Sequence, residues 1–148
     1  MADRFVDDYL LYLLARASSE VSAQFHVHLK AHGLQVPEWR VLASLSDSDS
    51  MTVGELAAHA LQRQPTMTKI IDRMAESGLI ERRQDEADRR KVRIFITGAG
   101  QRRVDDALAD AKRHEREVLS DYLPAEARSL KSVLRALIDR NGATPQDD

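Results

Sequence analysis

Cysteine is absent from this chain of 148 residues. Without a thiol the chain has no disulfide, no thiolate metal site and no cysteine nucleophile, and it cannot sense oxidants through a cysteine. No apolar run approaches the roughly 20 residues that a helix needs to span a bilayer. The N-terminal residues MADRFVDDYL are acidic, unlike those of a signal peptide. We therefore expect a cytoplasmic protein with no membrane partner.

Catalytic signatures are missing as well. The sequence contains no nucleophile elbow, phosphate-binding loop, dinucleotide fingerprint or HExxH motif. Its serines and histidines show no spacing that is typical of an activated nucleophile. We therefore expect that the chain is not an enzyme and uses no cofactor.

Charge is distributed unevenly along the chain. The length favours one domain, or one domain with a dimerisation extension. The net charge is −2, yet residues 61–97 hold nine Lys/Arg and six Asp/Glu, so this basic region carries +3 and the remainder −5. A positive region in an otherwise acidic chain indicates that binding to a polyanion is confined to that region.

The basic region has the pattern of a helix followed by a hairpin. Pro65 suits the first turn of a helix over 65–77, and Gly78 suits a left-handed helix end. Alternation over 92–97 predicts a half-buried strand, with 79–83 as its antiparallel partner. The apolar residues that recur at helical spacing, on the face opposite the charges, are Met67, Ile70, Ile71 and Met74.

One long amphipathic helix is predicted at the start of the chain, and two more are predicted after the basic region. Apolar residues at three- and four-residue steps predict one long helix from about Asp3 to His32, ended by Gly33. Its apolar stripe is too long for a small DNA-reading domain to cover, so we expect a partner subunit. After the hairpin, Thr97 can cap a fifth helix, and Pro124 starts a sixth.

The middle of the chain predicts a helix-turn-helix. A helix opens at Val36 and Pro37, and SDSDS (46–50) forms a polar loop. Thr52 and Glu55 form a T-x-x-E capping box that begins a helix over 53–60, which pairs with the helix over 65–77. The fold is therefore predicted as mainly α with a small β wing. A winged helix-turn-helix core (34–97) is flanked by dimerisation helices (1–33 and 98–142) and a tail (143–148), in an intertwined homodimer.

Three segments resemble the MarR family of bacterial transcription regulators, including its SlyA-like members. LAAHALQRQPTMTKIIDRMAESGLIER (56–82) is similar to the family's helix-turn-helix and the start of its wing. DRRKVRIFIT (88–97) resembles its wing signature, D-x-R followed by a strand ending in Leu-Thr, with Ile96 where Leu is usual. LQVPEWRVLASL (34–45) resembles its second helix. The resemblance implies a two-fold dimer whose recognition helices enter successive major grooves of a pseudo-palindromic site in double-stranded DNA, with half-sites roughly 34–36 Å apart.

The resemblance also implies which side chains bind DNA. Lys69 and Arg73 would hold phosphates or a guanine, beside Thr and Gln side chains that can read base edges. Arg90 would enter the minor groove at the wing tip, and Asp88 would brace it, unless Asp88 only forms the turn. The expected DNA-binding set is Gln64, Pro65, Thr66, Thr68, Lys69 and Arg73 on the recognition helix and Asp88, Arg89, Arg90 and Lys91 on the wing.

Many similar proteins release DNA when a small, often aromatic, acid binds between the winged core and the dimer helices. Trp39 matches a position that lines this pocket, although a lone Trp in a helix is equally typical of a core. Arg16 and Arg40 are candidates for the carboxylate of the acid by proximity only. The resemblance therefore implies a repressor that is relieved by a small-molecule effector.

A metal-responsive or ligand-independent regulator of the same fold is the alternative. His28 and His32 lie at i,i+4 and could share a metal from one helix face, with His26 and His114 as further candidates. Histidines at a polar helix end are usually solvated, and no carboxylate partner stands out in the sequence. We therefore expect no metal site.

Overall fold

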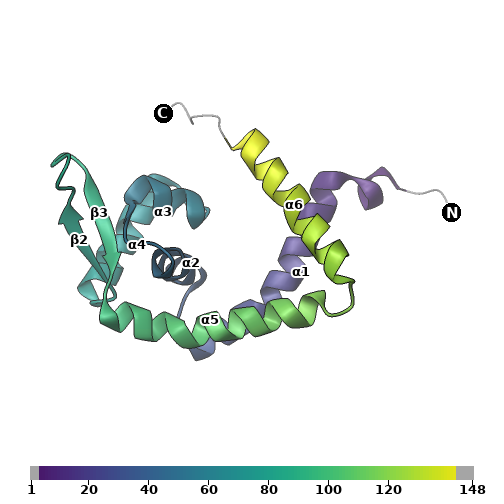
Figure 1. The fold of residues 1–148 in the computed structure, drawn as a ribbon, viewed down its shortest axis with the longest axis horizontal. Coiled ribbons are helices and arrows are strands. Elements are labelled where there is room, and N and C mark those ends of the chain that lie inside the picture. The colour runs from purple at the N-terminus through teal and green to yellow at the C-terminus, as the bar shows by residue number, and fades with distance from the viewer. Residues whose placement is uncertain (1–3, 143–148) are drawn as a thin grey trace. The chain divides into compact units, whose positions relative to one another are not determined.

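Helices and one small sheet make up the described residues, 4–142, of this computed structural model. The chain divides into two units, Met1–Lys112 and Arg113–Asp148. The predicted tail and the predicted helix start at Asp3 lie outside the described residues. The elements are η1 (Phe5–Asp8), α1 (Leu10–Ala31), α2 (Val36–Ser46), β1 (Met51–Thr52), α3 (Val53–His59), α4 (Gln64–Glu76), β2 (Ile80–Gln84), β3 (Val92–Ile96), α5 (Gly98–Leu119) and α6 (Pro124–Asn141) (Figure 1).

The predicted N-terminal helix is interrupted, so its prediction as one continuous helix is wrong. Tyr9 has an extended backbone, with φ −77° and ψ 123°, between the 3₁₀ turn η1 and the start of α1. Its ring stacks on that of Phe5, with 5.0 Å between the centroids. A break of one residue leaves the apolar spacing nearly unchanged, so periodicity could not reveal it. At the other end Gly33, with φ +69°, follows α1 as predicted.

The helix-turn-helix of α3 and α4 begins with the predicted capping box. The Glu55 backbone N–H donates to Thr52 Oγ1 at 3.1 Å, and the Thr52 N–H donates to Glu55 Oε2 at 3.0 Å. These bonds satisfy donors that a helix start would otherwise leave unpaired. Gly78 adopts φ +75° after α4 and so allows the chain to turn into β2.

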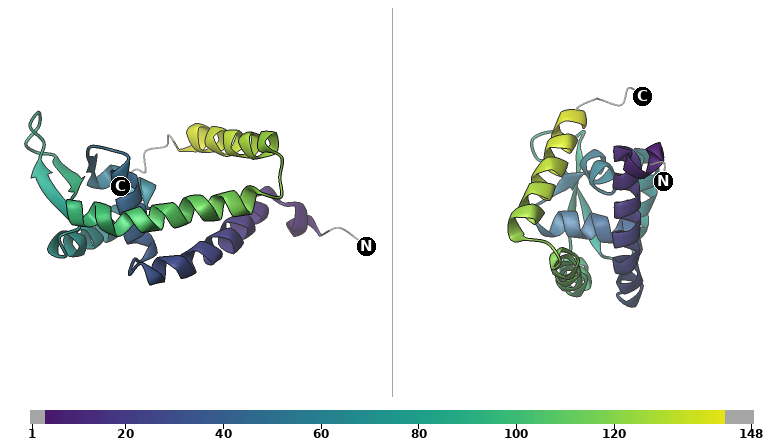
Figure 2. Two further views of the ribbon diagram at one scale, coloured as in Figure 1. Left: turned by 60° about the horizontal axis from the view of Figure 1, so that its bottom comes forward. Right: turned by 90° about the vertical axis from the view of Figure 1, so that its right-hand side faces the viewer.

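The sheet contains one more strand than the sequence predicted. β2 and β3 pair antiparallel as the predicted hairpin, with Arg82 opposite Ile94. β1 pairs with the other edge of β3, which gives the order β1-β3-β2. A strand of two residues is too short to show alternation. Figure 2 shows the hairpin projecting beyond the helices of the first unit, with its tip at the far end.

The core of the first unit lies between the helix-turn-helix, the sheet and α5. Two contacts join the end of α4 to the start of α5: the Thr97 hydroxyl donates to the Gly78 carbonyl at 2.6 Å and accepts from the Gly100 N–H at 3.1 Å. Large side chains that are fully buried there come from five helices and β3; they are Leu29, Val41, Leu42, Leu45, Leu56, Met67, Ile71, Met74, Ile94 and Val104.

The apolar side chains of α6, in the second unit, are not buried by the described chain. No residue of α6 is buried within the described chain, although the helix is amphipathic. Among residues 4–142, no helix has both the length and the apolar character to cross a bilayer. The large apolar side chains exposed in this unit are Tyr122, Leu123, Leu130, Val133 and Ile138.

Candidate nucleic-acid interface

The recognition helix α4 separates its residues into two faces. The predicted apolar face is buried against the core through Met67, Ile70, Ile71 and Met74. The Thr68 hydroxyl donates to the Gln64 carbonyl at 3.0 Å, so it can meet a base edge only as an acceptor. All six residues predicted to contact DNA on this helix are exposed: Gln64, Pro65, Thr66, Thr68, Lys69 and Arg73.

The exposed face of α4 is tied to the wing by an ion pair. The Arg82 guanidinium, on β2, donates to the Asp72 carboxylate. Asp72 lies between the two cations of α4 in the sequence and would otherwise repel a polyanion. Lys69 and Arg73 are the two cations of α4, and neither has an ion-pair partner within residues 4–142.

The wing tip is closed by Asp85, a residue that no sequence signal marked. Its Oδ1 accepts the backbone N–H groups of Ala87 at 2.8 Å and of Asp88 at 3.3 Å, which is an Asx-type turn. The Ala87 N–H is the main reason that the pKa of Asp85 is lowered, and the nearby charges of Arg93 and Lys91 act in the same direction. The Asp85 N–H also donates to the Lys91 carbonyl at 2.9 Å. The tip is therefore an ordered turn.

The contact expected between Asp88 and Arg90 is present at this tip. Asp88 Oδ1 accepts the backbone N–H of Arg90 at 3.1 Å and its side-chain Nε at 3.3 Å. One carboxylate thus forms the turn and also contacts the guanidinium. The Arg90 side chain remains 92% exposed. The contact with Asp88 therefore leaves most of the guanidinium accessible to solvent.

Arg93 links the wing to the start of the helix-turn-helix. Its Nε donates to Ser50 Oγ at 2.6 Å and its Nη2 to the Ser50 carbonyl at 3.0 Å. Its Nη1 lies 3.9 Å from Asp85 Oδ2. Ser50 belongs to the polar loop that precedes β1. No sequence signal marked either residue, because a polar loop and a strand arginine are both ordinary surface features.

The number of cations in the basic region overstates the number that lack a carboxylate partner. Arg83 pairs with Glu81, whose pKa is lowered mainly by that hydrogen bond, and its guanidinium lies 4.4 Å from the centre of the Phe95 ring. Four of the nine cations are therefore held in ion pairs: Arg82, Arg83, Arg90 and Arg93. The five with no ion-pair partner inside the described range are Arg63, Lys69, Arg73, Arg89 and Lys91.

The three residues predicted for an effector pocket have other contacts. The Trp39 ring meets that of Phe25 edge-on, with 5.2 Å between centroids, and packs against the core. Arg40 Nη1 donates to the Ala60 carbonyl at 3.2 Å. Arg16 donates to the Tyr12 hydroxyl at 2.8 Å and pairs with Glu20. Their role in binding an acid stays a prediction.

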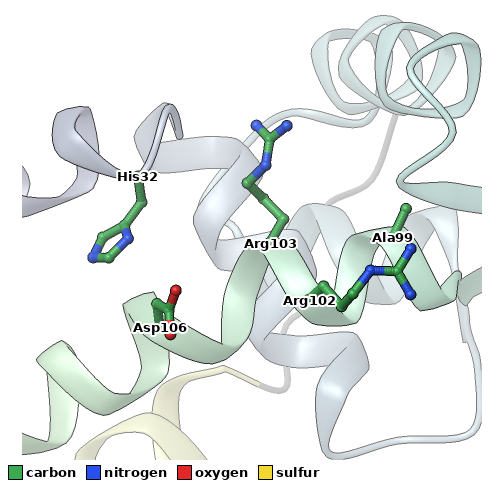
Figure 3. A pocket seen from close by; sticks show the side chains of 5 residues that line it. All are labelled: His32, Ala99, Arg102, Arg103 and Asp106. Carbon is green, nitrogen blue, oxygen red and sulfur yellow. The ribbon is translucent and has the colours of Figure 1, made fainter.

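A cleft of about 380 Å³ opens where the end of α1 faces the first turns of α5 (Figure 3). The guanidinium groups of Arg102 and Arg103, which line this cleft, point in different directions in Figure 3, so they do not converge on one anion. Beside the cleft, His32 Nε2 lies 2.6 Å from Asp110 Oδ2, a carboxylate partner that the sequence did not reveal. Residues 4–142 contain no group of three or more His, Cys, Asp or Glu that could hold a metal. The cleft is lined by His32, Ala99, Arg102, Arg103 and Asp106.

Comparison with known proteins gives consistent matches. The model of the MarR family matches residues 34–92. A MarR family transcriptional regulator from Silicibacter pomeroyi DSS-3 has a similar solved structure, with 46% identity, a TM-score of 0.82, and coverage of 93% of this chain and 98% of that one. The homoprotocatechuate degradative operon repressor of Escherichia coli is 27% identical over 95% of both chains. The repressor IacR of Pseudomonas putida is 32% identical, over 67% of this chain and 59% of IacR.

Proposed function

The chain belongs to the MarR family and is a DNA-binding transcription regulator, and on this premise we propose that it represses genes by binding a pseudo-palindromic operator as a homodimer. The observation that carries the proposal is the pairing of an exposed polar face on α4 with an ordered wing that ends in an exposed arginine. A helix that fits the major groove and a cation that fits the minor groove then act from one rigid unit.

The two elements have different tasks in this proposal. Gln64, Thr66 and Thr68, at the amino-terminal end of α4, read base edges, and Pro65 starts the helix there. Arg90 enters the minor groove at the wing tip, held by Asp88. Cations without an internal partner position the protein on the phosphates, and among residues 61–97 these include Lys69, Arg73, Arg89 and Lys91.

A second copy of the chain would cover the apolar surface that each unit leaves exposed. In the first unit Phe5 is 76% exposed, and α1 continues this surface with Leu10 and Leu11. In the second unit α6 contributes further apolar side chains but buries none of them. Obligate interfaces, which commonly bury about 2,000 Å² or more, are rich in apolar side chains of this kind. The proposed dimerisation segments are 1–33 and 98–142, and the proposed DNA-binding core is 34–97.

The effector in this proposal is a small aromatic acid. The Escherichia coli relative represses an operon that degrades an aromatic acid, homoprotocatechuate. In this chain Trp39 and Phe25 offer an aromatic pair at the junction of α1 and α2. The alternative is a regulator of the same fold that responds to a metal or to no ligand. As a regulator without a catalytic step, the protein would act in the cytoplasm, where bacterial DNA lies.

Fluorescence anisotropy with the intergenic DNA beside the protein's own gene tests the proposal. We expect salt-steep binding by a dimer, and release of the DNA by one member of a panel of aromatic acids. Release by Zn²⁺ or by a chelator, with no response to any acid, would favour the metal-responsive alternative. No specific binding to that DNA or to any site recovered by genome-wide selection would contradict the DNA-binding function itself.

A further inference from the structure

The turn between α3 and α4, residues 60–63, contains a strained backbone conformation at Leu61. Its φ is +57°, and within residues 4–142 no other residue except glycine has a positive φ. The Leu61 N–H donates to the Ala58 carbonyl at 3.3 Å and the Gln62 N–H to the Ala57 carbonyl at 2.9 Å, which is the Schellman arrangement of a helix end. Glycine usually occupies the left-handed position, because a Cβ is strained there. The Leu61 side chain is 74% exposed, so its burial does not offset the strain.

The carbonyl that precedes Leu61 has a partner outside the α3–α4 turn. Arg40, on α2, donates from Nη1 to the Ala60 carbonyl at 3.2 Å. Ala60 is fully buried, so water cannot replace this donor. A buried carbonyl without a donor costs free energy. The Arg40 guanidinium therefore stabilises the conformation in which the chain leaves α3 and passes through the left-handed Leu61.

The α3–α4 turn is not packed tightly against α2 on the side of the recognition helix. A cleft of about 540 Å³ lies there, lined by Pro37 of α2, Gln62 of the turn, and Lys69 and Arg73 of α4. Arg63, the residue before α4, makes no side-chain hydrogen bond that caps the helix. On this side neither close packing nor a cap fixes the start of α4, so its position depends on how the turn leaves α3.

We propose that Arg40 is a positioning residue for base recognition: its bond to the Ala60 carbonyl holds the strained α3–α4 turn, and the turn sets where α4 begins. This inference rests on the proposed function, in which the first turn of α4 reads base edges. Contacts to base edges depend on the placement of the helix start, whereas contacts to phosphates are spread over the interface and carry no sequence information. Loss of the Arg40 bond should therefore reduce the preference for the operator more than the affinity for DNA in general.

The test compares the operator with DNA of unrelated sequence for the wild type, Arg40→Met and Arg40→Lys. Met keeps much of the side-chain length but donates no hydrogen bond, whereas Lys keeps the charge and a donor. We expect Arg40→Met to lower the ratio of operator affinity to nonspecific affinity by about tenfold, and Arg40→Lys to recover much of it. Partial unfolding would lower both affinities equally and leave this ratio unchanged. Lys112→Met, which removes an exposed cation of α5, is the matched control.

The substitution Leu61→Gly tests the coupling to the strained turn. Glycine adopts a positive φ without strain, so the turn depends less on Arg40 once Leu61 is replaced. We expect Leu61→Gly to restore a large part of the affinity ratio in Arg40→Met and to change the ratio little in the wild type. Urea denaturation verifies that every variant is folded under the conditions of the binding measurement.

Two results would overturn the inference. One is an equal loss of affinity for both DNAs in Arg40→Met, since that result identifies a phosphate contact or a general loss of stability. The other is additivity of Arg40→Met and Leu61→Gly, because residues that act through one turn are coupled. In both cases the wild type still prefers its operator. A wild type without this preference would instead contradict the proposed function.

Discussion

Arg93 and Ser50, which are 43 residues apart in the sequence, are joined by two hydrogen bonds of 2.6 and 3.0 Å. One residue lies in the strand that returns from the wing tip, and the other immediately precedes β1. Thr52, two residues later, caps the first helix of the helix-turn-helix. The direction of the wing is therefore fixed relative to α3, and through α3 relative to the recognition helix.

Replacing Arg93 by Lys should weaken DNA binding although the charge is kept. Lys has a single ammonium group and cannot donate to the Ser50 hydroxyl and carbonyl as the planar guanidinium does. We expect a loss of about 1–2 kcal/mol in operator affinity, measured by anisotropy. Arg83→Lys, on the exposed pair with Glu81, is the control and should change affinity little. Unchanged affinity of Arg93→Lys would show that Arg93 acts by charge alone, and equal losses for the two variants would contradict a specific role for the contact with Ser50.

The wing tip should depend on pH through Asp85. The pKa of Asp85 is lowered in the folded state, so its carboxylate stabilises the tip above the ordinary value of about 3.9, and this stabilisation is lost as pH falls through the lowered pKa. The amide resonance of Ala87, which donates to this carboxylate, should shift in an NMR titration below about pH 4. Asp85→Asn should remove that transition. A titration of Ala87 that survives the substitution would assign the effect to another group.

Arg90→Ala should weaken DNA binding strongly and leave the dimer intact, because the side chain is exposed and distant from the apolar surfaces of α1. Asp88→Asn should have a smaller effect, since an amide oxygen can still accept the Arg90 backbone N–H but no longer pairs with the guanidinium. Anisotropy gives the affinities, and sedimentation gives the oligomeric state. If both variants bind as tightly as the wild type, the wing does not contact the minor groove through Arg90.

Gly100→Ala should destabilise the fold. A Cβ built at this position lies 2.1 Å from the Leu79 carbonyl oxygen and 2.9 Å from Ile96 Cγ1, so α5 would have to move away from the sheet. We expect a loss of about 1–3 kcal/mol in the free energy of unfolding, measured by urea denaturation. Gly54→Ala is the matched control in α3, where the nearest atom is 4.0 Å away. That substitution should stabilise the fold by roughly 0.4–1 kcal/mol.

The sequence predicted elements whose signals are local. The helix expected over 65–77 is α4 at Gln64–Glu76, and the capping box at Thr52 has the expected bonds. Each depends on residues within a few positions of one another. The partners that order the site are distant instead: Ser50 lies 43 residues from Arg93, and Asp110 lies 78 residues from His32. No spacing rule links residues so far apart, so neither contact could be predicted.

The sequence also could not predict which cations of the basic region, residues 61–97, are free to bind a polyanion. Its nine cations predicted a polyanion-binding surface, and counting alone could not separate cations that hold the wing together from those that are free. Arg82 and Arg93 are each bonded to another element, whereas Lys69 and Arg73 border an open cleft. The difference depends on which carboxylates the fold brings near, and this is known only once the strands are in register.

Because Asp72 of α4 pairs with Arg82 of β2, α4 cannot be transferred to another protein without changing the charge of its exposed face. A design that transplants residues 64–76 into another winged scaffold would carry an acidic side chain whose counter-ion stays behind on β2. The graft would then present a carboxylate to the DNA in place of a neutralised pair. To change which operator such a protein binds, α4 and β2 should therefore be exchanged together. The residues at positions 72 and 82 should be chosen as a pair.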